Sequence, residues 1–238
     1  MWPQRQSCTT ARHGCGIAAT RSQAAIFHAY YSELDTAGRL IVKRILVGWV
    51  VVVGILGLPK QSLSAEEVRL GEKVPDFAAH DVTGQVVRFS TTGQVTVVAF
   101  ISTRCPMSNA FNYRMNSLYN EFGERANFVF LNSNSNESII EVRRHSDAMG
   151  YDFPVYKDEG NAVADLLGAK APPDTFVIDA GGLLQYHGYI EDAPNPDRVK
   201  KRGLRTAIES VLNHQPVLEP ETHSLGCAIR RDKHSVHQ

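Results

Sequence analysis

Two mostly apolar runs, separated by a helical pattern, most restrict the folds open to this chain. Residues 95–101 (VTVVAFI) and 127–131 (NFVFL) are rich in β-branched and aromatic side chains and lack the alternation of a strand with one face in water. Between them, apolar side chains recur at helical spacing, namely Phe111, Met115, Leu118 and Phe122. Two buried strands joined through a helix predict an α/β fold whose sheet has helices on both faces.

The first half of the predicted domain continues this alternation of strands and helices. Its further elements are a short strand at 86–89, a helix at 137–149 that closes at Gly150, a strand at 153–156 and a helix at 162–167 stopped by Gly168. Asn132, Asn134 and Asn136 are interpreted as a loop that caps the helix at 137–149. These elements are expected to cover and widen the sheet.

The second half changes character. Residues 175–178 and 183–189 flank the turn Ala180-Gly181-Gly182 and predict a β-hairpin. We expect Pro196 to open a last helix that ends near Asn213. The apolar face of this helix would consist of Leu204, Ile208, Val211 and Leu212. Together the two halves predict a central mixed sheet flanked by helices.

The first 65 residues differ from the rest in charge and hydropathy. Lys43 and Arg44 precede a run of 14 residues without a polar side chain, and small residues follow at 62–65. A basic segment, a short apolar segment and a small-residue exit are typical of a secretion signal. We therefore expect export to the periplasm or another extracytoplasmic space, with cleavage near Ala65.

The alternative to cleavage is an N-terminal membrane anchor. A bilayer-spanning helix needs about 20 apolar residues, more than this run supplies, so we expect no stable membrane span after cleavage. Residues 1–41 are long for a signal and carry Cys8 and Cys15, which suggests that translation starts at Val42. The chain is thus interpreted as a leader (1–65, with the signal at 42–65), one domain (66–213) and a C-terminal tail (214–238).

The charge distribution bears on the partners of the domain. The leader carries a net charge of +5 and the remaining residues −5, although the whole chain is neutral. A protein that binds nucleic acid usually has a basic body, so a nucleic-acid partner is disfavoured. With 43% hydrophobic and 21% charged residues, the composition is that of a globular protein.

Several motifs of the domain occur in a characteristic order. Residues 74–77 (VPDF), the segment FISTRC that ends at Cys105, and residues 173–179 (PDTFVID) before a Gly-Gly turn resemble the thioredoxin-like superfamily, specifically its redoxin or peroxiredoxin-like (AhpC/TSA-type) branch. The resemblance implies a thioredoxin-like fold with an N-terminal β-hairpin extension. It also implies a reactive cysteine at the start of the first long helix and a cis-proline that faces it. Cys105 and Pro173 occupy these two positions.

The position of Cys105 supports reactivity independently of the resemblance. A cysteine between a buried strand and a helix, with Pro106 suited to the first helical turn, lies close to unpaired backbone N–H groups. That setting and the adjacent Arg104 favour the thiolate, which is the nucleophilic form. Ser102 and Thr103 are candidates to assist it. The alternative is a small buried hydrophobic side chain without a redox role.

Resolution of an oxidised Cys105 requires a second thiol. The sequence Cys105-Pro106-Met107-Ser108 has a serine where thioredoxins have a second cysteine, so Ser108 can donate a hydrogen bond but cannot form a disulfide. Outside the leader, Cys227 is the only other cysteine. We interpret it as a resolving thiol on a mobile tail. The alternatives are an unpaired cysteine, an interchain link or a purely structural bridge.

Comparison with peroxiredoxins leaves the substrate open. The family signature has a hydroxyl residue three positions before the cysteine, which Ser102 provides, but Val98 replaces the expected proline. Family members also use an arginine to polarise the peroxide, for which Arg104 and Arg114 are the substitutes. The predicted substrates are therefore a peroxide or a protein disulfide, with an external thiol as reductant.

No cofactor or metal is predicted. The copper-delivery relatives of the fold use Cys-x-x-x-Cys, and Cys105 has no partner at that spacing. His223, Cys227, His234 and His237 in the tail match no ligand pattern. The sequence thus favours an exported thiol-dependent oxidoreductase. The alternative is a non-catalytic thioredoxin-like module that binds an extended polypeptide, or a metal through its tail.

Overall fold

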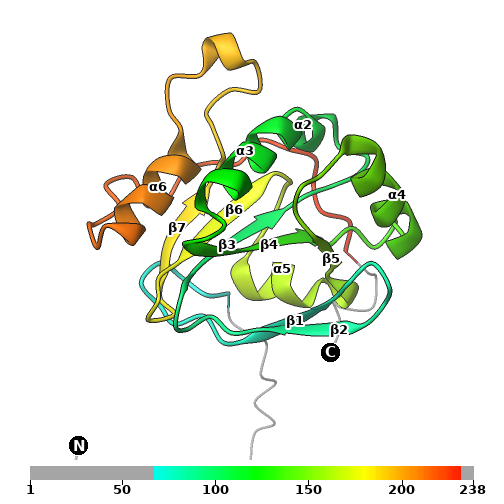
Figure 1. Ribbon diagram of the computed structural model, residues 1–238, viewed down its shortest axis with the longest axis horizontal. Coiled ribbons are helices and arrows are strands. Elements are labelled where there is room, and N and C mark those ends of the chain that lie inside the picture. Colours follow the sequence, from blue (N-terminus) through cyan, green and yellow to red (C-terminus); the bar gives the residue numbers. More distant parts are fainter. Residues whose placement is uncertain (1–66, 232–238) are drawn as a thin grey trace, which may run out of the picture. The chain divides into compact units, whose positions relative to one another are not determined.

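The chain folds around one seven-stranded mixed sheet (Figure 1). The structure, a computed structural model, describes residues 67–231, and the predicted leader lies outside these residues. The strands are β1 (Phe77–His80), β2 (Val86–Phe89), β3 (Val95–Phe100), β4 (Ala126–Asn132), β5 (Val155–Lys157), β6 (Asp174–Ile178) and β7 (Leu184–Gly188). The helices are α2 (Pro106–Asn109), α3 (Asn112–Phe122), α4 (Ile139–Met149), α5 (Ala162–Leu167) and α6 (Gly203–Leu212), with 3₁₀ turns at Glu159–Asn161 and Pro196–Arg198.

The strand order is β2-β1-β5-β4-β3-β6-β7. β3, β4 and β5 run parallel to one another, whereas β6 pairs antiparallel with β3, and β1 antiparallel with β5. The antiparallel hairpin of β1 and β2 forms one edge, as expected for the N-terminal extension. β3 and β4 are central and adjacent, so the residues that follow them meet at one edge of the sheet.

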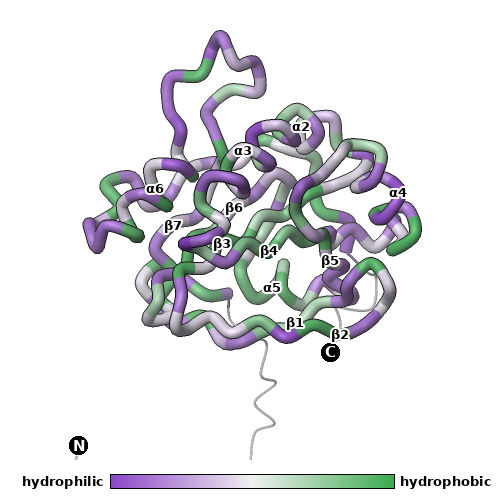
Figure 2. Tube along the Cα trace, in the orientation of Figure 1, coloured by the Kyte–Doolittle hydropathy of each residue, from purple (hydrophilic) through white to green (hydrophobic). Residues whose placement is uncertain are grey.

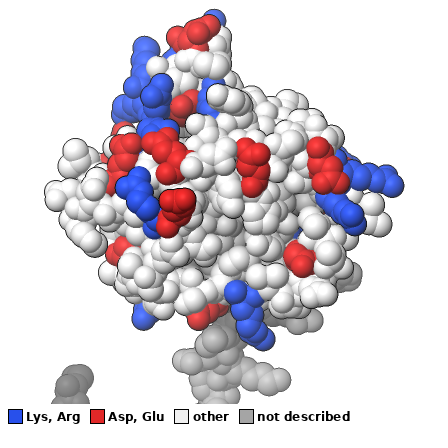
Figure 3. All heavy atoms as spheres, viewed as in Figure 1, with Lys and Arg blue, Asp and Glu red and all other residues white. Residues whose placement is uncertain are grey.

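The predicted two-sided burial of the central strands is confirmed, since every residue of β3 is buried. Val97 and Ala99 face a core that includes Phe111, Met115 and the apolar side of α6, while Val98 and Phe100 face a second core that includes α5. Successive strand residues point to opposite faces, so each strand contributes to both cores. Figure 2 shows hydrophobic residues concentrated in these central strands. Basic and acidic side chains are interspersed on the face shown in Figure 3.

Helix ends follow local chemistry, with two corrections to the sequence analysis. The helix predicted at 137–149 begins later, because Ser138 caps α4 by accepting from the Glu141 N–H at 3.3 Å, so the expected asparagine cap is wrong. Gly150 ends α4 with a φ of 60°, in the left-handed region, as expected. Glu137 therefore lies outside the helix.

The prediction that Pro196 opens the last helix is also wrong. Pro196 starts only the 3₁₀ turn Pro196–Arg198, capped by Asn195, and Val199 then adopts an extended conformation. The residues after Val199 are also outside a helix, because the Lys200 N–H donates to the Asp192 carboxylate at 2.9 Å and not to a helical carbonyl. The α-helix itself begins at Gly203 and carries the predicted apolar face.

Candidate active site

Cys105 follows β3 and caps the helix α2, as the sequence predicts. Its backbone is extended, with φ −85° and ψ 113°, and Pro106 occupies the first helical turn. However, the expected long helix is divided, because α2 spans one turn and α3 starts at Asn112 after a break at Ala110. The dipole of a one-turn helix is small, so α2 places less positive charge at Cys105 than the predicted long helix would.

The structure brings Cys105 and Cys227 together. The two sulfur atoms lie 2.8 Å apart, both as free thiols, and the Cys227 N–H donates to the Cys105 sulfur at 3.3 Å. Cys105 is only 1% exposed, whereas Cys227 is exposed. Residues 122 positions apart are thus placed for direct sulfur chemistry.

The pKa of Cys227 is raised by its surroundings. Its hydrogen bond with Cys105 raises the pKa of Cys227, and burial and the charge of Glu137 act in the same direction. A raised pKa keeps the Cys227 thiol protonated near neutral pH. Cys227 can therefore act as the proton donor of the pair.

Pro173 borders the same sulfur. The peptide bond between Pro172 and Pro173 is cis, which agrees with the sequence analysis. The carbonyl oxygen of Pro172 lies 3.6 Å from the Cys105 sulfur. A cavity of about 150 Å³ opens next to this loop. Its apolar lining includes Met107, Phe111, Pro173, Ile190 and Leu225.

The buried carboxylate of Glu137 was not identified from the sequence. Glu137 is 2% exposed and accepts four hydrogen bonds. The donors are the Ser102 hydroxyl (2.6 Å), the Thr103 N–H (2.8 Å), and the side-chain amides of Asn132 (2.6 Å) and Asn134 (3.0 Å). Burial alone would raise the pKa of Glu137, but these hydrogen bonds outweigh it and lower the pKa.

Glu137 connects to the cysteine through Ser102. The Ser102 hydroxyl donates to Glu137 and accepts from the Cys105 N–H at 3.2 Å. The sequence feature that could have indicated this site is the group of asparagines after residues 127–131. Residues that follow adjacent parallel strands lie at the same edge of a sheet, so these asparagines would be expected near the residues that follow 95–101. These asparagines are part of the site and not only a capping loop.

Two of the predicted assisting residues have other partners. Arg104 forms a two-point ion pair with Glu141, at 2.6 and 2.7 Å, so its charge is neutralised there and not directed at Cys105. The Ser108 hydroxyl accepts from the Ser102 N–H at 3.0 Å. Within residues 67–231, no hydrogen bond joins Ser108 to the Cys105 sulfur. Ser108 thus supports the loop that carries Ser102.

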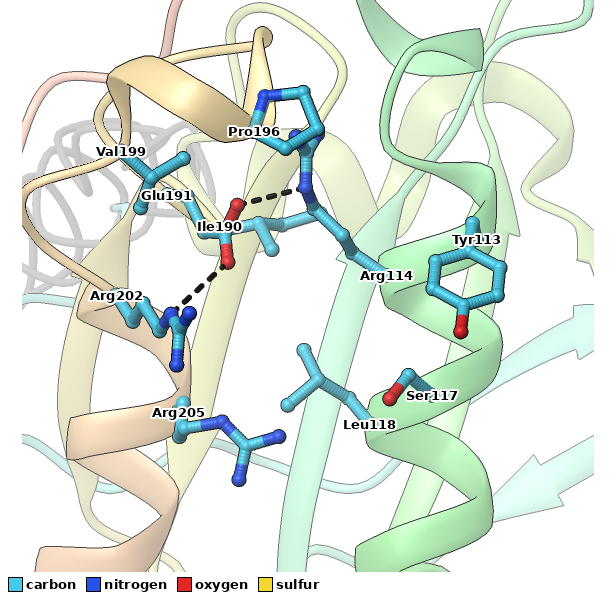
Figure 4. Close-up of a pocket in the computed structure, with 10 residues that line it drawn as sticks. All are labelled: Tyr113, Arg114, Ser117, Leu118, Ile190, Glu191, Pro196, Val199, Arg202 and Arg205. Atoms are coloured by element: carbon cyan, nitrogen blue, oxygen red, sulfur yellow. Dashed lines mark ion pairs between the residues drawn. The ribbon is translucent and has the colours of Figure 1, made fainter.

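Arg114 is also paired with other groups. Its Nε lies 2.7 Å from a carboxylate oxygen of Glu191, and its Nη2 donates to the Pro194 carbonyl at 2.8 Å. Figure 4 shows Arg114 and Arg202 directed at Glu191 in a separate cavity of about 320 Å³. Neither substitute arginine is therefore placed to polarise a peroxide at Cys105.

Residues 214–231 of the tail are docked on the domain, so the interpretation of Cys227 as part of a mobile tail is wrong. In Figure 1 it runs from α6 past α2 toward the β5 side of the sheet. The Ile229 N–H donates to the Lys170 carbonyl at 2.9 Å, and the Ile229 side chain is buried. Among the described residues no cluster of three potential metal ligands occurs, and His234 and His237 lie outside them. None of the helices within residues 67–231 is long and apolar enough to cross a membrane.

Comparisons with known proteins agree with this arrangement. A model of the AhpC/TSA family matches residues 70–187. Among curated proteins, the thiol-disulfide oxidoreductase ResA of Geobacillus thermodenitrificans (strain NG80-2) is 29% identical over 120 residues, which cover 50% of this chain and 68% of ResA.

Two solved structures are similar over most of their length. An uncharacterized conserved protein from Geobacillus kaustophilus is 28% identical with a TM-score of 0.64, covering 71% of this chain and 95% of that one. The hypothetical protein SMc02350 from Sinorhizobium meliloti 1021 is 30% identical with a TM-score of 0.63, covering 71% and 97%. A putative thiol:disulfide interchange protein DsbE from Chlorobium tepidum shares the fold at 24% identity, with a TM-score of 0.52, covering 61% of this chain and 99% of that one. This match and the mixed seven-stranded sheet confirm the predicted thioredoxin-like architecture.

Proposed function

We propose, from the premise that this chain belongs to the AhpC/TSA family of the thioredoxin-like superfamily, that Cys105 and Cys227 form the redox pair of a thiol–disulfide oxidoreductase. Family membership and the similarity to ResA support a redoxin-type thiol oxidoreductase. The observation that carries the assignment to this pair is the 2.8 Å separation of the two free sulfurs. ResA, a relative by sequence, is named for the same class of reaction.

The reaction transfers two electrons to a substrate disulfide. The Cys105 thiolate attacks one substrate sulfur, forms a mixed disulfide and releases the other substrate sulfur, which takes up a proton. The Cys227 sulfur then attacks Cys105, gives up its own proton and forms the Cys105–Cys227 disulfide, while the second substrate thiol leaves. An external thiol returns the pair to its reduced form. Pro173 would border the bound substrate, and Ser102 and Thr103 would hold the loop before Cys105.

A disulfide is a better substrate for this site than a peroxide. Peroxide reduction at a cysteine benefits from a cation beside the sulfur, because negative charge develops on the departing oxygen. Arg104 and Arg114 are both paired with glutamates. The buried carboxylate of Glu137 adds negative charge near the pair, which acts against such a step.

Reaction with a stoichiometric disulfide tests the assignment. On treatment of the reduced protein with oxidised glutathione, we expect both thiols to disappear together and the intact mass to fall by two hydrogen atoms. Peptide mapping should recover Cys105 linked to Cys227, which also separates the result from oxidation of Cys8 or Cys15. With hydrogen peroxide, we expect oxidation no faster than that of a free cysteine.

Two results would contradict the proposal. If the thiols react with oxidised glutathione no faster than free cysteine does and no linked peptide forms, the chain is a non-catalytic thioredoxin-like module. If peroxide oxidises the pair much faster than oxidised glutathione does, the substrate is a peroxide and not a disulfide.

Export is the second part of the proposed function. The apolar run at residues 45–58 and the basic pair Lys43 and Arg44 support a cleaved signal. An oxidising compartment would also suit a protein whose second thiol lies on an exposed segment. We expect N-terminal sequencing of the protein from its native cells to begin within a few residues of Ala65. Abundant peptides from residues 1–41 would contradict both the cleavage and the start at Val42.

A further inference from the structure

We propose that residues 224–231, here called the strap, are held on the domain by two polar latches that position Cys227 over Cys105 and cover it. The first latch is the Ser224–Asp174 hydrogen bond and the second is the Arg231–Asp165 ion pair. These four are positioning residues, because they act through Cys227 and do not touch the reacting sulfurs. The inference rests on the proposed function, since it concerns how the redox pair closes.

The second latch fixes the end of the strap. The Arg231 guanidinium lies 2.7 Å from a carboxylate oxygen of Asp165 in α5 and also donates to the Ala169 carbonyl at 2.9 Å. Just before it, Ile229 packs into the core beneath the sheet at 7% exposure. The Arg230 carbonyl accepts from the Ser135 N–H at 2.8 Å and from the Asn161 side-chain amide at 3.5 Å, and the Arg230 N–H donates to the Asn134 side chain at 2.8 Å.

The first latch fixes the start of the strap. The Ser224 hydroxyl donates to Asp174 at 2.7 Å, directly after the cis-proline. Asp174 is 1% exposed and also accepts from the Lys170 N–H and pairs with His187. Because this carboxylate is held by three partners, it is a rigid anchor. The strap is therefore fixed on both sides of Cys227.

Between the latches, the backbone passes very close to the proline loop. A Cβ atom added at Gly226 would collide with the carbonyl group of Pro172, whose backbone position is fixed. A glycine is thus required for the strap to seat at this depth. Seating brings the Cys227 N–H and sulfur onto Cys105 and leaves Cys105 1% exposed.

The physical consequence is a high effective concentration of Cys227 at Cys105. In a flexible chain, two thiols 122 positions apart meet rarely, because closing so long a loop costs conformational entropy. The latched strap already holds the two thiols together, so most of this entropy is lost before the disulfide forms. The latches therefore favour closure of the disulfide. They also restrict access to Cys105, so a polypeptide substrate must lift the strap to reach it.

Equilibration of the pair against glutathione buffers tests the strap. Relative to wild type, Arg231→Ala should lower the equilibrium constant for disulfide formation about tenfold, which makes the pair about 30 mV less reducing. Arg230→Ala is the matched control, because it removes the same charge one position away while its backbone contacts persist. We expect it to stay within about twofold of wild type. Gly226→Ala should lower the constant more than Arg231→Ala does.

Access to Cys105 gives an independent measurement. In a Cys227→Ser background, iodoacetamide should label Cys105 about tenfold faster when Arg231 is replaced by alanine, and unchanged with Arg230→Ala. Equal thermal midpoints would show that the domain remains folded, and Asp165→Asn replaces Arg231→Ala if that variant does not fold.

The outcomes separate the two proposals. If the wild-type pair fails to close at any glutathione ratio, the proposed function is wrong. If it closes and the Arg231 and Arg230 variants titrate and label alike, the proposed function stands and the latched strap is wrong.

Discussion

Replacement of Cys105 by serine is expected to lower the rate of disulfide exchange by roughly 1,000-fold or more, to the background of the reagents. A hydroxyl has no accessible anionic form at neutral pH, so the attacking group is lost. Cys227→Ser should behave differently, because Cys105 can still attack but nothing resolves the product. We therefore expect this variant to accumulate a mixed disulfide with the substrate, detected by intact mass.

The contrast between these two variants assigns the order of attack. Exposure alone would favour Cys227 as the attacking sulfur, because Cys227 is exposed and Cys105 is buried. The raised pKa of Cys227 has the opposite effect, because it keeps Cys227 in the unreactive thiol form. If Cys105→Ser traps the mixed disulfide and Cys227→Ser does not, Cys227 is the nucleophile and Cys105 the resolving thiol. Titration of the trapped adduct with dithiothreitol provides the control that it is a disulfide.

Much of the fold could be predicted because burial leaves a local pattern. The strand at 86–89 and the helix at 162–167 have the predicted bounds, and the run at 95–101 is buried on both faces. Gly150 and Gly168 mark helix ends by their left-handed conformations. Such features depend on neighbours in sequence, which periodicity and turn residues report directly.

The errors occur where distant residues decide the local structure. The segment after Pro196 is kept out of a helix by Asp192, and the supposed mobile tail is anchored by residues in β6 and α5. In the sequence, Glu137 has the pattern of an ordinary first residue of a helix. Its four donors come from the segments at the ends of β3 and β4, which lie side by side only in the folded sheet. Pairing of Cys105 with Cys227 was anticipated as an option, but its 2.8 Å geometry is a long-range property.

Removal of the Glu137 carboxylate is expected to be among the most destabilising changes in the domain. Glu137→Ala would remove the acceptor of the buried Ser102 hydroxyl, of the buried Asn132 and Asn134 amides and of the partly buried Thr103 N–H, and each donor left unpaired costs free energy. We expect the free energy of unfolding to fall by about 3 to 5 kcal/mol, as for other broken buried charged networks. Urea denaturation would measure it. The matched control is Glu141→Gln, which breaks the partly exposed pair with Arg104 and should cost less than about 1 kcal/mol.

The pH dependence of the free energy of unfolding distinguishes the contribution of the charge of Glu137 from that of its shape. Its hydrogen bonds lower the pKa in the folded state, so the stabilisation is present above the unfolded value of about 4.3 and is lost as the pH falls below it. Glu137→Gln keeps the shape and one acceptor oxygen but has no charge to titrate. The difference in unfolding free energy between wild type and this variant should therefore shrink between about pH 5 and pH 3. A difference that stays constant over this range would show that Glu137 is not a charged acceptor, and the proposed link from its carboxylate through Ser102 to the backbone of Cys105 would then be wrong.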